Sequence, residues 1–85
     1  MRHNLPMLPI GITMRAEAQH GITFYYVIGP PCSGKTTYIN HCLKACRAHK
    51  IIAAKCTWDS AELSSSIADM KATGVTVCYV EALEP

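Results

Sequence analysis

The stretch that decides the fold is FYYVIGPPCSGKTTYINHCL, which spans residues 24–43. Its first five residues are aromatic or aliphatic and predict a buried strand. Residues 37–43 carry apolar side chains at helical spacing and predict a helix. The eight residues between them, Gly29–Thr36, fit the pattern G-x-x-x-x-G-K-[ST]. Working outward from this stretch, we expect a strand, a specialised loop and a helix in direct succession.

The loop has the composition of a phosphate-binding loop, or P-loop. Successive backbone N–H groups in a curled loop can point inward and surround an anion, and the N-terminus of the following helix favours negative charge. We expect Gly29 to let the chain leave the strand with unusual dihedral angles. We expect Gly34, which has no Cβ, to let the backbone approach a phosphate closely. Pro30 and Pro31 stiffen the loop and reduce the entropy lost when it becomes ordered.

The side chains that follow supply charge and a metal ligand. Lys35 offers a compact positive charge to the β- and γ-phosphates, and the Thr36 hydroxyl is placed to bind Mg²⁺. Thr37 is a further candidate, for the α-phosphate. The predicted binding residues are Gly29, Pro30, Pro31, Cys32, Ser33, Gly34, Lys35, Thr36 and Thr37. A chance match in a chain of this length is expected in roughly one case in a few hundred.

The stretch 28–37, IGPPCSGKTT, resembles the loop of the P-loop nucleoside triphosphatases and kinases, in the form found in AAA-type ATPases and in small-molecule or polynucleotide kinases. Short ATP-binding proteins of this kind are common in bacteriophages. The resemblance implies an α/β fold, ATP or another nucleoside triphosphate as ligand, and Mg²⁺ as cofactor. Cys32 departs from the family, which more often has Gly or another small residue there. The resemblance covers about the first half of a typical P-loop domain.

Length and composition limit the alternatives. With 85 residues the chain makes one domain, and 49% hydrophobic and 16% charged residues are typical of a globular core. We find no secretory signal and no apolar run of membrane-spanning length, so no membrane partner is expected. The five cysteines are odd in number and irregularly spaced, which argues against a disulfide framework and favours the cytoplasm, that of a host cell if the chain is phage-encoded. Cys42 and Cys46 share one helix face, where two buried thiols are a simpler interpretation than half a metal site.

Two parts of the chain are distinguished. Residues 1–21 are an irregular N-terminal segment, in which 10–14 could form a short edge strand and 15–21 a turn or a single helical turn. Residues 22–85 are predicted to form a minimal P-loop domain of βαβαβ type. Its strands are expected at 22–28, 51–56 and 75–80, and its first helix at 34–48. The fold class is therefore α/β, with a short parallel sheet of about three strands between helices.

The second helix has a predicted start and end. Asp59 and Glu62 fit a capping box, Trp58 and Leu63 fit a hydrophobic staple, and Gly74 is placed to end the helix. Trp58 has a second interpretation as an aromatic surface on which a base could stack, for which the staple is the simpler explanation.

The resemblance also implies a carboxylate that holds Mg²⁺ from a neighbouring strand, the Walker B position. Glu81 follows the last predicted strand and is our candidate for it, both as a metal ligand and, with Lys35, as a catalytic residue. The family usually has Asp there, often with a second acid, whereas Ala82 follows here. A solvated carboxylate is an equally good interpretation. Asp59 is an alternative candidate, although a capping role accounts for it.

These observations predict Mg²⁺-dependent binding of a nucleoside triphosphate, with ATP the first choice. Slow or partner-dependent hydrolysis or phosphoryl transfer is expected, because no arginine lies in a recognisable finger or lid segment. The alternatives are a non-enzymatic nucleotide- or phosphate-binding interaction module and a truncated P-loop kinase. Nucleic-acid binding is a weaker possibility, because the net charge is only +2 and no basic stripe is present. Exposed sheet edges favour a homo-oligomer or another protein partner.

Overall fold

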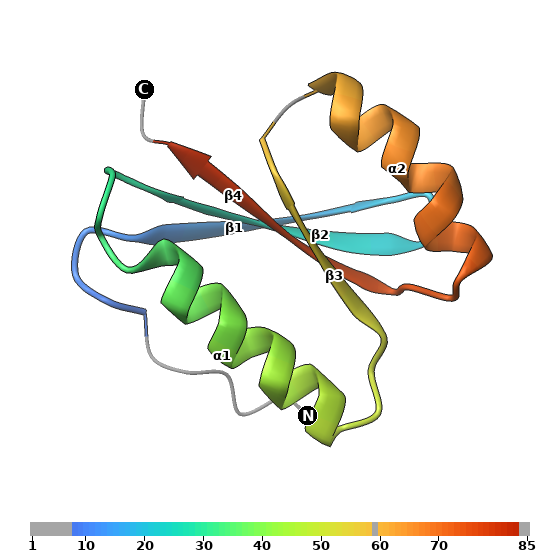
Figure 1. Ribbon diagram of the computed structural model, residues 1–85, viewed down its shortest axis with the longest axis horizontal. Helices are drawn as coiled ribbons and strands as arrows, with labels where there is room; N and C mark the ends of the chain where they lie inside the picture. The colour runs from blue at the N-terminus through green and yellow to red at the C-terminus, as the bar shows by residue number, and fades with distance from the viewer. Residues whose placement is uncertain (1–7, 59, 84–85) are drawn as a thin grey trace.

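The computed structural model describes residues 8–58 and 60–83. Four strands and two helices follow one another along the chain (Figure 1). Their bounds are β1 Thr13–Gln19, β2 Ile22–Gly29, α1 Lys35–Ala48, β3 Ala53–Thr57, α2 Ser60–Ala72 and β4 Val77–Leu83. The α/β class and the predicted order of elements from residue 22 onward are thereby confirmed. Neither helix of the described chain is long and apolar enough to cross a membrane.

The strands form one sheet in the order β1-β2-β4-β3. β4 pairs in parallel with β2 on one side and with β3 on the other. The helices α1 and α2 supply the long crossovers that parallel neighbours require. The expected sheet of about three parallel strands is therefore too small, because β1 adds a fourth, antiparallel strand and makes the sheet mixed.

The prediction of an irregular N-terminal segment is wrong for residues 13–19, which form β1. The turn expected at 15–21 is limited to the last two residues of that range, His20 and Gly21. β1 pairs with β2 along its whole length, from Thr13 opposite Ile28 to Gln19 opposite Ile22. The connection is the dipeptide His20-Gly21, in which both residues have positive φ, 55° and 77°. This is the geometry of a two-residue hairpin turn, whose twist matches that of the strands it joins. The edge strand suggested for 10–14 exists, but it begins later and is longer.

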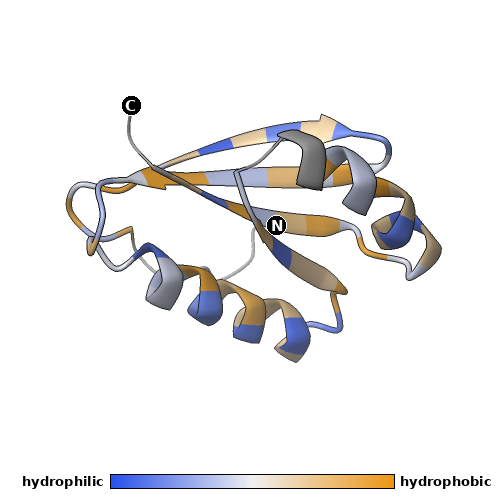
Figure 2. Ribbon diagram, turned by 45° about the horizontal axis from the view of Figure 1, so that its top comes forward, coloured by the Kyte–Doolittle hydropathy of each residue, from blue (hydrophilic) through white to orange (hydrophobic). Residues whose placement is uncertain are grey.

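The two helices cover opposite faces of the sheet. On one face, α1 packs against a buried cluster that contains Val27 of β2 and Tyr79 of β4. On the other, α2 packs through Met70, with Leu63 and Ile67 beside it, on a cluster that includes Phe24. Because side chains alternate between faces along a strand, these two clusters make both faces of the central strands apolar. Figure 2 shows much of the length of these strands in orange, the colour of hydrophobic residues.

Helix α1 agrees with its prediction within one residue. It turns the buried side chains of Tyr38, Ile39, Cys42 and Cys46 toward the sheet. Both cysteines are part of the apolar cluster, which confirms their interpretation as buried thiols. Burial raises the pKa of Cys42, and it raises the pKa of Tyr38 to about 12. These groups are therefore neutral in the folded protein near neutral pH.

Helix α2 ends as predicted. Gly74 has a φ of 81°, and the N–H of Val75 donates to the carbonyl of Met70 at 2.9 Å, a geometry typical of a glycine-terminated helix. Asp59 lies outside the described residues, and so does the side chain of Glu62, so the capping box stays a prediction. The alternative role of Asp59 in nucleotide chemistry lies outside them as well.

Candidate functional site

The Gly29–Thr36 loop lies at the end of the sheet where the parallel strands finish (Figure 1). It leaves β2 directly and enters α1 at Lys35. The last residues of β2 and β4 are register partners, with Gly29 opposite Leu83. Because β4 is the immediate neighbour of β2, the side chain of Glu81, near the carboxyl end of β4, lies close to the loop. The strand, loop and helix expected from the sequence are thus found in the predicted order.

The loop curls through two residues with left-handed backbone conformations. Cys32 has a φ of 60° and Gly34 a φ of 92°, and Gly34 occupies the N-cap position of α1. Gly34 has no side chain to cap the helix, and the first turn carries no acidic residue. The first turn of α1 therefore provides neither a side-chain cap nor a negative charge of its own for the free N–H groups at this helix end. A Cβ built on Gly34 would meet no atom within 4 Å, so the space beside it is open.

Gly29 is required for a different reason from the one predicted. Its φ does not lie in the positive region, so unusual dihedral angles are not its role. A Cβ at Gly29 would instead approach Ser33 Oγ at 3.0 Å, Gly11 O at 3.3 Å and Ile12 Cγ1 at 3.3 Å. Two of these neighbours belong to the segment before β1. The absence of a side chain lets the loop fold back over the end of β2.

The N-terminal segment that contacts Gly29 was missed as part of the site. Ile12 N–H donates to Pro9 O at 3.2 Å, and Gly11, with a φ of 90°, is the third residue of this tight turn. Such a turn needs positive φ at that position, which glycine accepts. Ile12 is buried in the cluster beneath α1. The signal in the sequence was the Pro9-Ile10-Gly11 turn, but nothing in it named Gly29 as the partner.

Lys35 is the only buried charged side chain of the described residues. It is 4% exposed, and its ammonium donates to Gly29 O at 2.9 Å and to Pro30 O at 2.6 Å. No carboxylate in the described part of the chain pairs with it. A buried ammonium usually has a counter-charge, because removing it from water is costly. The loop therefore holds a desolvated positive charge whose partner is not supplied by the described residues.

Thr36 and Glu81 come together across 45 positions of sequence. The Thr36 hydroxyl is 3.1 Å from each carboxylate oxygen of Glu81 and donates to that group. Glu81 was expected to follow the last strand, but it lies within β4, which continues to Leu83. Its neighbour in register is Val27 of β2, two residues before Gly29. The structure therefore brings the two candidate metal ligands, Thr36 and Glu81, into contact with each other.

The candidate residues border a depression of about 250 Å³. Its lining residues are Cys32, Ser33, Gly34, Lys35, Thr36, Thr37 and Glu81. Seven of the predicted site residues thus share one surface, whereas Gly29, Pro30 and Pro31 do not line it. The hydroxyl oxygen of Ser33 is buried and has no hydrogen-bond partner among the described residues. The charged, polar lining suits a small anionic ligand.

This set of residues could hold a divalent cation only in part. Glu81 and Thr36 offer oxygen ligands, which Mg²⁺ prefers. Within residues 8–58 and 60–83, no group of three or more His, Cys, Asp or Glu side chains is placed to hold a metal ion. A cation here would therefore keep several water ligands, as Mg²⁺ commonly does at phosphate sites.

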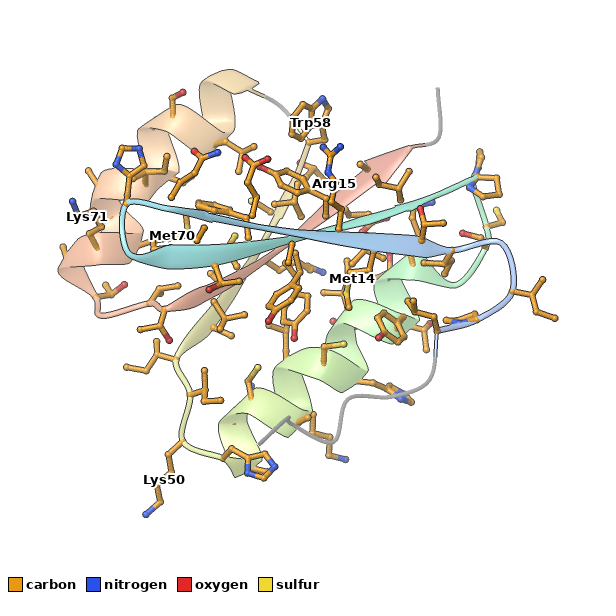
Figure 3. All side chains as sticks on the ribbon, turned by 180° about the vertical axis from the view of Figure 1, so that it is seen from behind. Met14, Arg15, Lys50, Trp58, Met70 and Lys71 are labelled. Atoms are coloured by element: carbon orange, nitrogen blue, oxygen red, sulfur yellow. The ribbon has the colours of Figure 1, made fainter. Side chains whose placement is uncertain are left out.

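Trp58 lies near this end of the sheet but on the side of α2. It is 57% exposed, and its ring meets Tyr26 edge-on with centroids 5.4 Å apart. The Arg15 guanidinium lies 5.7 Å from the centre of the same Tyr26 ring (Figure 3). The backbone N–H of Trp58 also donates to the backbone carbonyl of Glu81 at 2.9 Å. These contacts give Trp58 a packing role, and the staple with Leu63 stays a prediction.

Comparisons with protein-family models, with curated proteins and with solved structures gave no match to this chain. The function is therefore argued from the residues and geometry of the loop.

Proposed function

We propose that the chain binds a Mg²⁺–nucleoside triphosphate, ATP in the first instance, at the Gly29–Thr36 loop. The observation that carries this proposal is the buried ammonium of Lys35, which has only backbone carbonyl partners in the described chain. An anion in the neighbouring depression would supply the missing counter-charge. The helix N-terminus without an acidic residue and the buried, unpartnered Ser33 hydroxyl support the same ligand.

Membership of the P-loop nucleotide-binding proteins is part of this proposal. Three features support it together: the G-x-x-x-x-G-K-T sequence, its position between β2 and α1, and a carboxylate on the parallel neighbour β4. We assign residues 22–83 to a minimal P-loop domain with helices on both sides of the sheet. β1 is an addition to that core.

Thr36 and Glu81 are the residues that would hold Mg²⁺. When bound, the cation would neutralise charge on the β- and γ-phosphates. The Thr36 hydroxyl that now donates to Glu81 would turn its oxygen lone pair to the cation, and the Glu81 carboxylate would contribute charge directly or through a water molecule. Lys35 would stay anchored by the loop carbonyls and direct its charge to the terminal phosphates.

Turnover is proposed to be slow or to depend on a partner. Phosphoryl transfer needs an oriented nucleophile and positive charge near the γ-phosphate beyond the loop lysine. Neither Arg15 nor Arg47 lines the depression. Lys35 and Glu81 are therefore the proposed catalytic residues in the described chain. The same observation favours a second candidate function, a nucleotide-binding interaction module without catalysis. We place either activity in a reducing cytoplasm, because the five cysteines, all within the described residues, form no disulfide and Cys32 is exposed.

The metal-dependent part of the proposal is tested with Glu81→Gln. Isothermal titration calorimetry would measure ATP binding with Mg²⁺ and with EDTA. We expect the variant to lose at least about tenfold in affinity with Mg²⁺ and to change little without it. Asp69→Asn removes an exposed carboxylate of α2 and serves as the matched control. Equal effects of the two substitutions would contradict the assigned role of Glu81.

Turnover separates the two candidate functions. Phosphate release would be measured with wild-type protein at saturating Mg²⁺–ATP, with Lys35→Ala as the background. Release above that background supports a slow enzyme. Binding with no release above background supports the interaction module.

A further inference from the structure

The two edges of the sheet differ in how they are protected from other strands. β3 is five residues long and carries the exposed Lys55 at its centre, a feature that discourages pairing with another strand. β1, on the opposite edge, has seven residues, contains no lysine or proline, and is exposed at every position except the half-buried Met14. Among the described residues no strand pairs with its outer side. β1 is therefore the edge available to another strand.

The hairpin determines which backbone groups of β1 point outward. Gln19 and Ile22 flank the two-residue turn and face each other across it, so their backbone groups point inward, between the strands. Backbone groups alternate between the two edges of a strand. Glu17, Arg15 and Thr13 therefore share the inward direction of Gln19. The N–H and C=O groups of Ala18, Ala16 and Met14 point away from β2, so the outer edge is centred on Ala16.

The sequence of β1, TMRAEAQ, is complementary to itself when it is reversed about this same residue. In an antiparallel pair of two copies centred on Ala16, Arg15 lies opposite Glu17 of the second copy, and Glu17 lies opposite its Arg15. Thr13 meets Gln19, and Met14 meets Ala18. Because Ala16 has its backbone groups outward, the central pair is of the hydrogen-bonded kind. The charged pairs are then of the other kind, in which opposite side chains approach more closely.

We propose that two copies of this chain associate through β1 into a continuous eight-stranded sheet, with Ala16 on the two-fold axis. The surface is the outer edge of β1, Thr13–Gln19, and its partner is the same edge of a second copy. A two-fold axis makes the contact closed, so one edge of each copy is used and the assembly stops at two. Both ion pairs form on one face, because side chains two apart on a strand share a face.

The side chains of β1 suit this arrangement on both faces. Met14 and Arg15 lie on opposite sides of the strand (Figure 3). Met14 packs at the border of the cluster beneath α1, and it would lie directly opposite Ala18 of the second copy, with the small Ala16 next to it on the same face. On the other side the Arg15 guanidinium already lies against the ring of Tyr26, which limits its freedom before pairing. Glu17 accepts a hydrogen bond from Gln19, so its carboxylate is held as well.

Charge reversal tests both the surface and the register. In the symmetric dimer, position 15 of each copy faces position 17 of the other. The Arg15→Glu variant therefore has two carboxylates facing each other at both of these contacts. The Glu17→Arg variant has two guanidinium groups facing each other at both. Each variant alone should dimerise roughly tenfold or more weakly than wild type, because two favourable cross-strand pairs become two repulsive ones. An equimolar mixture of the two variants restores an opposite pair at both positions. The mixture should therefore dimerise at least as well as wild type. Sedimentation velocity over a range of concentrations measures all three samples.

The control and the contradicting results are equally definite. Lys55→Glu makes the same change of charge on the opposite edge, at an exposed position of β3, and should leave association unchanged. Circular dichroism shows whether each variant is folded. A wild-type protein that remains monomeric up to about 1 mM would overturn the proposal, and so would a mixture that associates no better than its components. Growth beyond the dimer would refute the closed two-fold contact. The outcome does not depend on nucleotide binding.

Discussion

Replacing Lys35 by methionine separates what this residue does for the ligand from what it does for the fold. Methionine keeps much of the apolar stem and removes the charge. The Lys35 side chain is 4% exposed, and its ammonium is held at 2.9 Å and 2.6 Å by two carbonyl oxygens. Two carbonyl contacts offset only part of the cost of removing an ammonium from water. We therefore expect Lys35→Met to leave the free energy of unfolding of the ligand-free protein unchanged or to raise it.

The effect on binding should have the opposite sign. A unit charge about 4 Å from a phosphate oxygen contributes roughly 4 kcal/mol at an effective dielectric constant of about 20. Part of this is offset by desolvation of the phosphate, so a net loss of about 2–4 kcal/mol is expected. At about 1.4 kcal/mol for each factor of ten, ATP should bind roughly 30- to 1,000-fold more weakly.

Two assays on the same protein preparations check this prediction. Urea unfolding followed by circular dichroism gives the stability of the ligand-free variant, and calorimetry gives its affinity for Mg²⁺–ATP. Lys44→Met, on the exposed side of the same helix, is the matched control and should alter neither quantity. Affinity within about threefold of wild type would refute the assigned role of Lys35. A large loss of stability without nucleotide would show that the lysine holds the loop together instead.

Three further predictions follow from the loop and the core. Gly29→Ala should lower the free energy of unfolding by about 1–3 kcal/mol in urea, since its Cβ would crowd Ser33 Oγ at 3.0 Å; an unchanged midpoint would contradict this packing. The exposed thiol of Cys32 should be the first to react with iodoacetamide and Mg²⁺–ATP should slow the reaction, whereas Cys42, buried and with a raised pKa, should stay unmodified in the native state. Mass spectrometry locates the label, and equal rates with and without nucleotide would place the ligand elsewhere. Burial raises the pKa of Tyr38 from 10.0 to about 12, so the fold holds its proton more tightly than the unfolded chain does. The resulting stability is fully present below pH 10 and should be lost as the pH rises toward 12, by on the order of 2–3 kcal/mol, and urea unfolding that does not change over this range would count against it.

The local parts of the site could be predicted because their signals are local. The loop pattern, the apolar run before it and the helical spacing after it lie within residues 24–43, and each acts through neighbours in sequence. The helix end at Gly74 is of the same kind, because positive φ at that position favours glycine. Glu81 was expected beside the loop because the carboxyl ends of parallel strands meet at one edge of a sheet, and it does line the depression there. Its position within β4 was missed, since the end of a strand is set by pairing with its neighbours.

What could not be predicted depends on contacts between distant segments. β1 is mostly exposed, so it lacks the apolar alternation by which strands are usually recognised, and its only strong signal was the His20-Gly21 turn. The requirement for glycine at position 29 comes partly from Ser33 of the loop itself and partly from Gly11 and Ile12, which the hairpin brings back to the loop. The Trp58 ring rests on Tyr26, two strands away in the sheet, and no spacing in the sequence encodes that contact.

The central claim is that the Gly29–Thr36 loop binds the β- and γ-phosphates of a nucleoside triphosphate. Calorimetric titration of the wild-type protein with ATP and with AMP, both with Mg²⁺, tests it most directly, because the two ligands share the base and the ribose and differ in the β- and γ-phosphates. We predict saturable one-to-one binding of ATP, at least about a hundredfold tighter than that of AMP. Equal affinities, or no heat of binding with ATP at millimolar concentration, would contradict the account.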